Sequence, residues 1–303
     1  MAMASNANAP GKIYIGISGW RYQGWRGVFY PEKLPHRREL EFASRRFNTI
    51  ELNGSFYSLQ RPQSFAQWHE QTPPDFVFAI KGSRYITHML RLRRIEGALA
   101  NFFAQGLLVF GAKLGPILWQ LPPNFNFEPE RLEAFFSLLP KTRKQAADLA
   151  RNHDERLKDR SWFDVSKGSP IRHAIEIRHE SFVNEEFIRL LRRYDIGLVV
   201  ADTVEWPLLM DVTSNFVYCR LHGSEELYAS GYEEEALDIW ANRVLSWAQG
   251  GEVENGRKAS TRNAPRRKRR DVFVYFDNDM KVRAPFDAEQ LSARVTRLLA
   301  HPT

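Results

Sequence analysis

The sequence predicts a single (β/α)₈ barrel of the TIM type. Its 303 residues suit one large α/β domain. Eight short runs rich in β-branched or aromatic residues alternate with helix-like stretches, as expected of a parallel sheet. Gly16 and Gly19 do not form a GxGxxG fingerprint, and no GxxxxGK[ST] loop occurs, so an open nucleotide-binding sheet is disfavoured. Eight strand–helix units in a row favour closure into a barrel.

Eight strands are expected where short apolar runs are bounded by turn residues or by helix-like segments. They lie at Ile13–Ser18, Thr49–Asn53, Phe76–Lys81, Pro116–Leu121, His173–Arg178, Gly197–Ala201, Phe216–His222 and Val272–Asp277. Crossover segments, mostly helices, are expected between and after them. These lie at Arg37–Phe47, Pro62–Gln71, Leu92–Leu107, a pair within Pro129–Leu157, Asn184–Tyr194, a short turn near Glu205–Leu209, Glu234–Gln249 and Ala288–Ala300.

The domain boundaries follow from composition. Residues 1–11 are rich in Ala and Asn and are expected to form a disordered tail, and residues 12–303 form the barrel domain. Residues 250–270 are polar and rich in like charges, so we expect a flexible, solvated insertion on the N-terminal face of the barrel. Eight cations and no acid lie in Arg257–Arg270, while the formal net charge is +7, so the rest of the chain is close to neutral.

Composition also bears on the compartment. No apolar stretch approaches the roughly 20 residues that span a bilayer, so we expect no membrane association. Cys219 is the single cysteine and lies in an apolar run, so it is expected to be a buried, inert thiol. A chain without an intrachain disulfide fits a reducing compartment. We therefore expect a cytoplasmic protein, and the sequence leaves its oligomeric state open.

Polar residues end almost every predicted strand. In a barrel the strands are nearly continuous apolar runs, and their carboxyl ends form the catalytic face. Glu51 and Asn53 are two apart, as are Glu176 and Arg178, and Arg220 and His222, so each pair shares a face of its strand. Each residue alone could satisfy a neighbour, as Glu51 with Lys81 or Glu176 with Arg220. Together they predict a site, because buried charges must pair or bind something.

We interpret this set as an acid–base site for a small polar or anionic ligand. The candidate catalytic residues are Glu51, Glu176, Asp202 and His222, with a glutamate as general base and His222 as proton-transfer partner. Arginine forks suit carboxylate or phosphate groups, and aromatic rings could stack on a sugar or base. The candidate binding residues are Trp20, Asn53, Tyr57, Lys81, Arg84, His88, Gln120, Arg178, His179, Arg220 and Asn278.

At these residues the chain resembles the YecE-like family, which carries domain of unknown function 72. The matching segments span residues 13–298 in the family's order. They include Gly16-Ile-Ser-Gly-Trp20, Glu51-Leu-Asn-Gly-Ser-Phe-Tyr57, Phe76-Val-Phe-Ala-Ile-Lys81, Leu114-Gly-Pro-Ile-Leu-Trp-Gln-Leu-Pro-Pro123, Glu176-Ile-Arg-His179, Arg220-Leu-His-Gly223 and Tyr275-Phe-Asp-Asn278. The resemblance implies a TIM-type barrel and supplies no activity. Asp277 departs from the family pattern, which favours Asn there, and the basic insertion is an embellishment.

Three functional hypotheses remain open. The first is an enzyme of hydrolase or isomerase type that needs no predicted cofactor. The second is a barrel enzyme of the sugar isomerase or endonuclease type, in which Glu176, His179, Asp202, His222 and Asp277 hold a divalent metal; nearby cations oppose it. The third is a non-catalytic protein that senses a ligand or binds nucleic acid through Arg257–Arg270.

Overall fold

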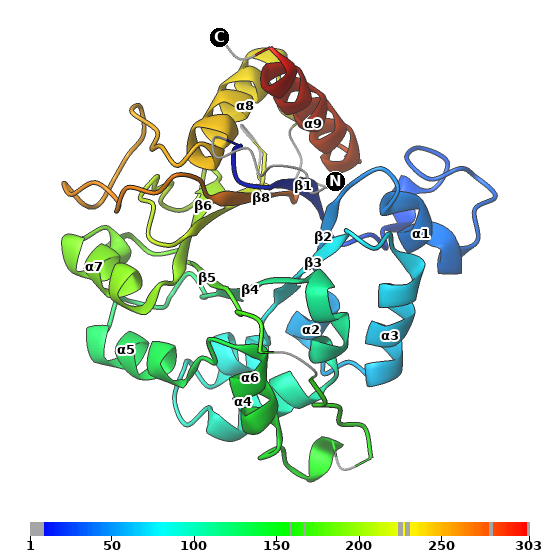
Figure 1. Ribbon diagram of the computed structural model, residues 1–303, viewed down its shortest axis with the longest axis vertical. Helices are drawn as coiled ribbons and strands as arrows, with labels where there is room; N and C mark the ends of the chain where they lie inside the picture. The colour runs from blue at the N-terminus through cyan, green and yellow to red at the C-terminus, as the bar shows by residue number, and fades with distance from the viewer. Residues whose placement is uncertain are drawn as a thin grey trace, which may run out of the picture.

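The chain folds into one closed parallel barrel surrounded by helices (Figure 1). The computed structural model describes residues 9–157, 159–165, 168–223, 227, 231–278 and 281–301. Strand order is β1 to β8, and β1 pairs with both β2 and β8, so the predicted (β/α)₈ architecture is confirmed. The strands are β1 Ile13–Ser18, β2 Thr49–Leu52, β3 Val77–Lys81, β4 Leu114–Gln120, β5 His173–Glu176, β6 Gly197–Asp202, β7 Phe216–Leu221 and β8 Asp271–Phe276.

Helices cover the outside of this barrel. They are α1 Glu39–Ala43, α2 Gly54–Tyr57, α3 Pro62–Gln71, α4 Glu96–Ala104, α5 Pro129–Leu138, α6 Arg143–Ala150, α7 Glu185–Tyr194, α8 Glu234–Ala248 and α9 Ala284–Ala300. Shorter 3₁₀ segments lie at Gln23–Trp25, His36–Arg38, Leu107–Lys113, Glu155–Leu157 and Glu180–Phe182, and one π-helical turn lies at Tyr85–Met89. None of the helices in the described part of the chain is long and apolar enough to cross a bilayer.

Alternation along the strands separates two cores. One face of each strand packs against the helices in the large outer core, where Ile17, Ile50 and Ile80 are fully buried. The other face fills the barrel interior. The interior residues are mainly aromatic or small: Val77, Ala79, Leu118, Ala174, Val199, Ala201, Trp206, Phe216, Tyr218, Phe273 and Tyr275.

The connection between β6 and β7 lacks a helix. The turn expected near Glu205–Leu209 is a run of bends and irregular backbone through residue 215. The basic insertion fills that place instead, in orange between α7 and α8 in Figure 1. Met210 N donates to Arg257 O at 2.8 Å, and the Asp211 carboxylate accepts from the backbone of Ala259 and Ser260 at 2.8 and 3.0 Å.

Residues 250–270, which the sequence predicts as a solvated insertion, combine exposed charged residues with a few buried positions. The segment has no helix or strand, but Val253, Ser260, Ala264 and Arg270 are buried. Arg270 donates to the carbonyl oxygens of Gly250, Gly251 and Pro265 at 2.6, 2.9 and 2.8 Å, which joins the ends of the segment. Isolated small apolar residues and one buried arginine are too sparse a pattern to indicate this packing in advance. Whether the segment moves stays a prediction.

The predicted N-terminal tail lies largely outside the described residues. Its last residue, Gly11, is buried and donates to Ala248 O at 2.8 Å. A Cβ at Gly11 would lie 1.8 Å from Arg270 O, so glycine lets the chain pass close to the end of the insertion. Gly11 therefore packs against the end of α8, and the predicted disorder of the tail stays a prediction.

Candidate active site at the carboxyl ends of the strands

The side chains that point into the barrel become polar at its carboxyl end. In β3, β5 and β7 small or aromatic interior positions are followed, two residues on, by Lys81, Glu176 and Arg220, and in β2 Glu51 follows the buried Thr49 in the same way. Gln120 follows Leu118 in β4 in the same way. The period of two places these residues in one layer above the apolar interior. The sequence prediction that they converge is thus met by the geometry.

Arg220 lies at the centre of this layer and is fully buried. Its Nη2 is 3.0 Å from Glu51 Oε1 and 2.7 Å from Asp277 Oδ2, and its Nη1 is 2.7 Å from Glu176 Oε2. Burial alone would lower the pKa of Arg220, but the three carboxylates raise it well above its usual value. The guanidinium contacts three protein carboxylates, so an anionic ligand would compete with them for Arg220, and its role in ligand binding stays a prediction.

Glu51 is held by four donor contacts. Ser18 Oγ and Tyr218 OH each donate to it at 2.5 Å, and Arg220 contacts both carboxylate oxygens, with Nε at 3.1 Å and Nη2 at 3.0 Å. An ionised carboxylate has about four acceptor positions, and donors from Ser18, Tyr218 and Arg220 take those of Glu51, which leaves no lone pair for a substrate proton. Its geometry is that of a counter-ion that orients Arg220.

Glu176 bridges two arginines. Arg178 Nε donates to Oε1 at 2.8 Å, Gln120 Nε2 donates to the same atom at 2.7 Å, and Arg220 contacts Oε2. Burial opposes ionisation, yet Arg220 and Arg178 hold the pKa of Glu176 well below its usual range. The guanidinium of Arg178 also lies 4.0 Å from the centre of the Trp206 ring. Glu176 is therefore an ionised, rigidly placed acceptor.

His222 and Asp277 form a carboxylate–imidazole pair beside Arg220. His222 Nδ1 is 3.2 Å from Asp277 Oδ2, and His222 Nε2 is 3.9 Å from Glu176 Oε2. Burial opposes the charge on Asp277, but Arg220 and His222 hold its pKa below its usual range. An ionised carboxylate at Nδ1 favours the tautomer in which Nε2 is the basic nitrogen. Trp206 packs edge-on against the imidazole with ring centres 5.3 Å apart.

Lys81 is a buried amine with a different environment. Its Nζ lies 4.4 Å from the centre of the Phe56 ring, and it makes no ion pair with a carboxylate in the described part of the chain. Burial and the charge of Arg220 lower the pKa of Lys81 to about 8. Such an amine changes protonation near neutral pH and suits either proton transfer or binding of an anionic group.

The π-helical turn after β3 adds a second positive region. His88 packs edge-on against Phe56, with ring centres 5.2 Å apart. Burial, then the charges of Arg178, Lys81 and Arg84, lower the pKa of His88 to about 4. His88 is thus neutral at physiological pH, and three cations from two different strand ends converge around it. An anionic group would be attracted here.

Three predicted residues point elsewhere. Asp202 faces outward, where Trp240 Nε1 of α8 donates to its Oδ2 at 3.1 Å, because its inward neighbour on β6 is Ala201. Burial raises the pKa of Asp202. Asn278 Nδ2 donates to Asp287 of α9 at 2.8 Å. His179 accepts from Ser181 N at 3.2 Å and caps the 3₁₀ turn that follows β5. One-residue offsets in strand phase account for the first two corrections.

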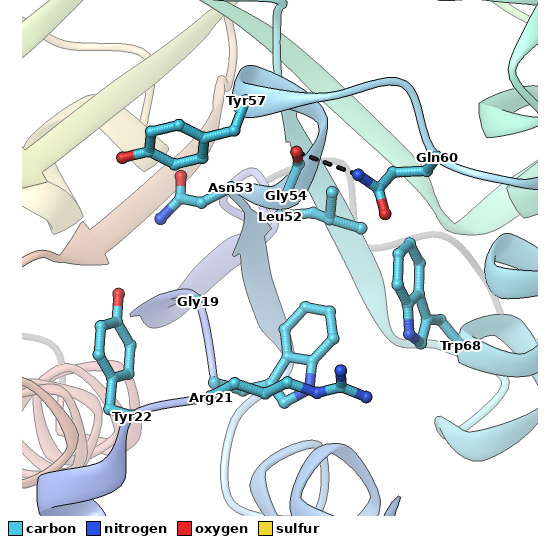
Figure 2. A pocket seen from close by; sticks show the side chains of 10 residues that line it. Gly19, Arg21, Tyr22, Leu52, Asn53, Gly54, Tyr57, Gln60 and Trp68 are labelled. Atoms are coloured by element: carbon cyan, nitrogen blue, oxygen red, sulfur yellow. Dashed lines mark hydrogen bonds between the residues drawn. The ribbon is translucent and has the colours of Figure 1, made fainter.

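The remaining binding candidates surround a neighbouring cavity. Trp20, Asn53 and Tyr57 line a space of about 340 Å³ between the ends of β1 and β2 (Figure 2). Asn53 Nδ2 donates to Ser18 Oγ at 3.0 Å, and Ser18 contacts Glu51, so this cavity adjoins the buried cluster. Arg84 is exposed at the start of the π-helical turn and contributes to the charge around His88.

The metal-ligand hypothesis does not match this donor set. Among the described residues, no group of three or more His, Cys, Asp and Glu side chains is placed to hold a metal ion. Glu51, Glu176 and Asp277 already surround a cation, the guanidinium of Arg220. Asp202 and His179, two of the proposed ligands, make their contacts elsewhere.

Sequence reasoning missed several members of the cluster. The sequence suggests Asp277 only as a metal ligand and Phe56 only as a stacking ring, and it does not point to Ser18, Tyr218 or Trp206 as members of the cluster. Extending the period of two along β7 back from Arg220 would have found Tyr218. No pattern could have indicated Trp206, because it comes from the irregular connection between β6 and β7.

The fold and the ionisable layer define this protein as a TIM-type barrel with a candidate active site at its C-terminal mouth. The chain belongs to the family described as "Protein of unknown function DUF72", whose model matches residues 14–302. The resemblance drawn from the sequence motifs is therefore confirmed.

Relatives and solved structures agree with this assignment. UPF0759 protein YecE of Escherichia coli (strain K12) is 30% identical over 246 residues, which cover 78% of this chain and 82% of that protein. UPF0759 protein YunF of Bacillus subtilis (strain 168) is 29% identical over 156 residues, covering 50% and 52%. A DUF72 family protein from Thermotoga maritima superposes with a TM-score of 0.71 at 25% identity, covering 96% of this chain and all of that one.

Proposed function

We propose that the protein is an enzyme that performs acid–base chemistry on a small polar or anionic metabolite at the carboxyl ends of its strands. The observation that carries the proposal is Lys81, a buried amine beside a cluster whose carboxylates all face Arg220. A buried ammonium without a carboxylate partner is costly, and an anionic group of a substrate would supply that partner.

The proposed roles follow from the contacts. Lys81, with Arg84 and His88 beside it, binds the anionic group. His222 transfers the proton through Nε2, and Asp277 sets its tautomer and stabilises its charged form. Glu51 and Glu176 act as positioning residues, because each accepts hydrogen bonds from N–H groups of the Arg220 guanidinium. The reaction types that need such groups and no predicted cofactor are hydrolysis and isomerisation.

Metabolite profiling tests this proposal. The purified protein is incubated with a cell extract of small metabolites, and substrate loss and product gain are followed by mass spectrometry. We expect turnover to fall by about 100-fold or more in His222→Asn, and substrate binding to weaken in Lys81→Met. The matched controls His153→Asn and Lys33→Met lie outside the cluster and should behave as the parent.

Two outcomes would overturn the proposal. Saturable ligand binding without any turnover, unchanged in His222→Asn, would indicate a sensor. Turnover that requires a stoichiometric divalent ion, found by elemental analysis, would indicate the metal-dependent hypothesis instead.

A second candidate function is electrostatic binding of nucleic acid by the insertion. Arg257 pairs with Glu180 at 2.9 Å, Lys258 pairs with Glu252 at 2.6 Å, and Arg270 holds backbone carbonyls. The run Arg266–Arg269 is exposed and makes no ion pair with an acid in the described residues. Four adjacent cations without apolar neighbours match a phosphate backbone better than a lipid surface.

Binding of a labelled single-stranded DNA, followed by fluorescence anisotropy against salt, tests this candidate. If all four side chains neutralise phosphates, the logarithm of the association constant falls against the logarithm of salt with a slope of about −3. The slope should vanish when Arg266, Arg267, Lys268 and Arg269 are all replaced by Ala. A slope that survives this replacement would reject the candidate.

A further inference from the structure

The cavity between the ends of β1 and β2 is distinct from the Arg220 cluster. It is lined by residues that directly follow each of these strands, and Trp68 of α3 lies on one side (Figure 2). Its volume of about 340 Å³ is in the range of small-molecule sites. Phe56 and Tyr57 are consecutive in α2; Phe56 lies beneath Lys81 Nζ, while Tyr57 lines the cavity. The cavity and the proposed reaction centre are therefore neighbours separated by one short helix.

Aromatic rings form the walls of this cavity. Trp20 and Trp68 meet edge to face, with ring centres 5.6 Å apart and planes at 80°. Tyr57 is 68% exposed and packs edge-on against Phe56. A large aromatic ring that stays exposed at the rim of a cavity is typical of a ligand contact. Because Trp20 and Trp68 are nearly perpendicular, they present one ring face and one ring edge to a ligand. A planar base is typically bound between two parallel rings instead.

Amide groups provide the polar contacts. Asn53 Oδ1 is buried and accepts no hydrogen bond from the described residues, while Nδ2 donates to Ser18 Oγ. Gln60 Nε2 donates to Gly54 O at 3.1 Å and to Ser58 O at 2.9 Å, which turns Oε1 into an acceptor for another group. Both amides line the cavity. A ligand that fits them carries hydrogen-bond donors such as hydroxyl groups.

We infer that this cavity binds a sugar ring. A sugar presents C–H faces to aromatic rings and hydroxyl donors to amide oxygens, and the exposed Arg21 at the rim adds a donor for ring substituents. That the cavity binds the sugar portion of the enzyme's substrate rests on the proposed function. That it binds a sugar at all does not depend on the proposed function. Asn53 would connect the two, because it contacts the cavity on one side and Ser18 on the other.

Saturation-transfer NMR and tryptophan fluorescence test the inference on the full chain. The probes are glucose, galactose, N-acetylglucosamine, ribose and glucose 6-phosphate, with adenosine and uridine as planar-base comparisons. We expect at least one sugar to give a saturable signal that exceeds those of the nucleosides. Tyr57→Ala should weaken this binding by about 3- to 10-fold through loss of the aromatic contact. Asn53→Ala should weaken it by about 5-fold through loss of an acceptor.

The controls separate the cavity from the reaction centre. Tyr85→Ala removes a partly exposed ring outside the cavity and should leave sugar binding unchanged. His222→Asn should also leave it unchanged even where it removes turnover. Sugar binding that depends on Tyr57 in a protein with no turnover supports the cavity and rejects the proposed function. The inference would be overturned if no sugar bound, if the nucleosides bound more tightly than the sugars, or if Tyr57→Ala left the affinity for the sugar unchanged.

Discussion

Two charge-rich regions of the molecule are each organised by a buried arginine, with opposite results. Arg220 is fully buried at the C-terminal mouth and contacts three carboxylates, so its region is internally neutralised. Arg270 is 2% exposed, and within the described part of the chain its guanidinium donates to backbone carbonyls, while the run Arg266–Arg269 before it stays exposed. Burial lowers the pKa of Arg270, whereas carboxylates raise the pKa of Arg220 despite burial.

The comparison shows that the role of a charged region depends less on how many charges it holds than on which groups those charges contact. At the mouth, the carboxylates of Glu51, Glu176 and Asp277 all lie within a few ångströms of Arg220. Lys81 is buried there without an ion pair to a carboxylate of the described residues, and it becomes the candidate for chemistry. In the insertion, Arg257, Lys258 and Arg270 have protein partners and hold the segment in place. The exposed run Arg266–Arg269 is free to attract an anionic binding partner. Four predictions test this distinction, through the free energy of unfolding.

The largest effect is expected for Arg220→Met. This change leaves Glu51, Glu176 and Asp277 buried without their shared cation, so the free energy of unfolding in urea should fall by about 3–5 kcal/mol. Adding Glu51→Gln and Asp277→Asn to Arg220→Met should recover part of this loss. The exposed control Arg266→Met should change stability by no more than about 0.5 kcal/mol. A loss from Arg220→Met as small as the control's would refute the central role of this ion cluster.

The second effect concerns Lys81 and pH. The folded pKa of about 8 lies below the ordinary value of 10.5, so the folded state binds fewer protons than the unfolded state between these values. Stability should therefore rise with pH across that window, because the penalty for burying the charged amine disappears. At pH 7 the penalty amounts to about 3 kcal/mol. Lys81→Met carries no such penalty, so its free energy of unfolding minus that of the parent should fall from pH 7 to pH 10.5. A difference that stays constant over this range contradicts the lowered pKa of Lys81.

A smaller loss is expected for Arg270→Met. The carbonyl groups of Gly250, Gly251 and Pro265 lose their donor, which costs about 1–3 kcal/mol. The effect is smaller than for Arg220 because carbonyl oxygens are neutral and water can replace the donor. Limited proteolysis should also cut residues 250–270 faster in this variant. Equal cleavage rates in Arg270→Met and Arg269→Met would show that Arg270 does not hold the segment.

The smallest effect on stability is expected when Arg266, Arg267, Lys268 and Arg269 are all replaced by Ala. Exposed cations without acidic partners contribute little to folding, so the free energy of unfolding should change by about 0.5 kcal/mol or less. A clear loss of stability would mean that these side chains make folding contacts, and the contrast between the two regions would then fail. Retention on a heparin column should fall in the same variant.

The period-two pattern predicted most of the ion cluster but not the roles within it. Glu51, Glu176, Arg178 and Arg220 lie at strand ends in the sequence, and closure of the barrel brings them together. Which carboxylate accepts from which donor depends on distances of a few tenths of an ångström, set by strand register and packing. Glu51 is therefore predicted as a base from the sequence, whereas its contacts in the structure are those of a counter-ion to Arg220.

The sequence by itself determined the strand order, the inward polar layer and the family, because alternation and motifs are local properties of the chain. Only the tertiary structure decided that Asp202 and Asn278 face helices, that Asp277 joins His222, and that residues 250–270 take the place of a helix between β6 and β7. These outcomes depend on which surfaces the folded chain brings into contact, across 9 positions for Asn278 with Asp287, 38 for Asp202 with Trp240 and 48 for Asp211 with Ala259. No local pattern encodes such contacts, since their energy arises only when both partners are buried together.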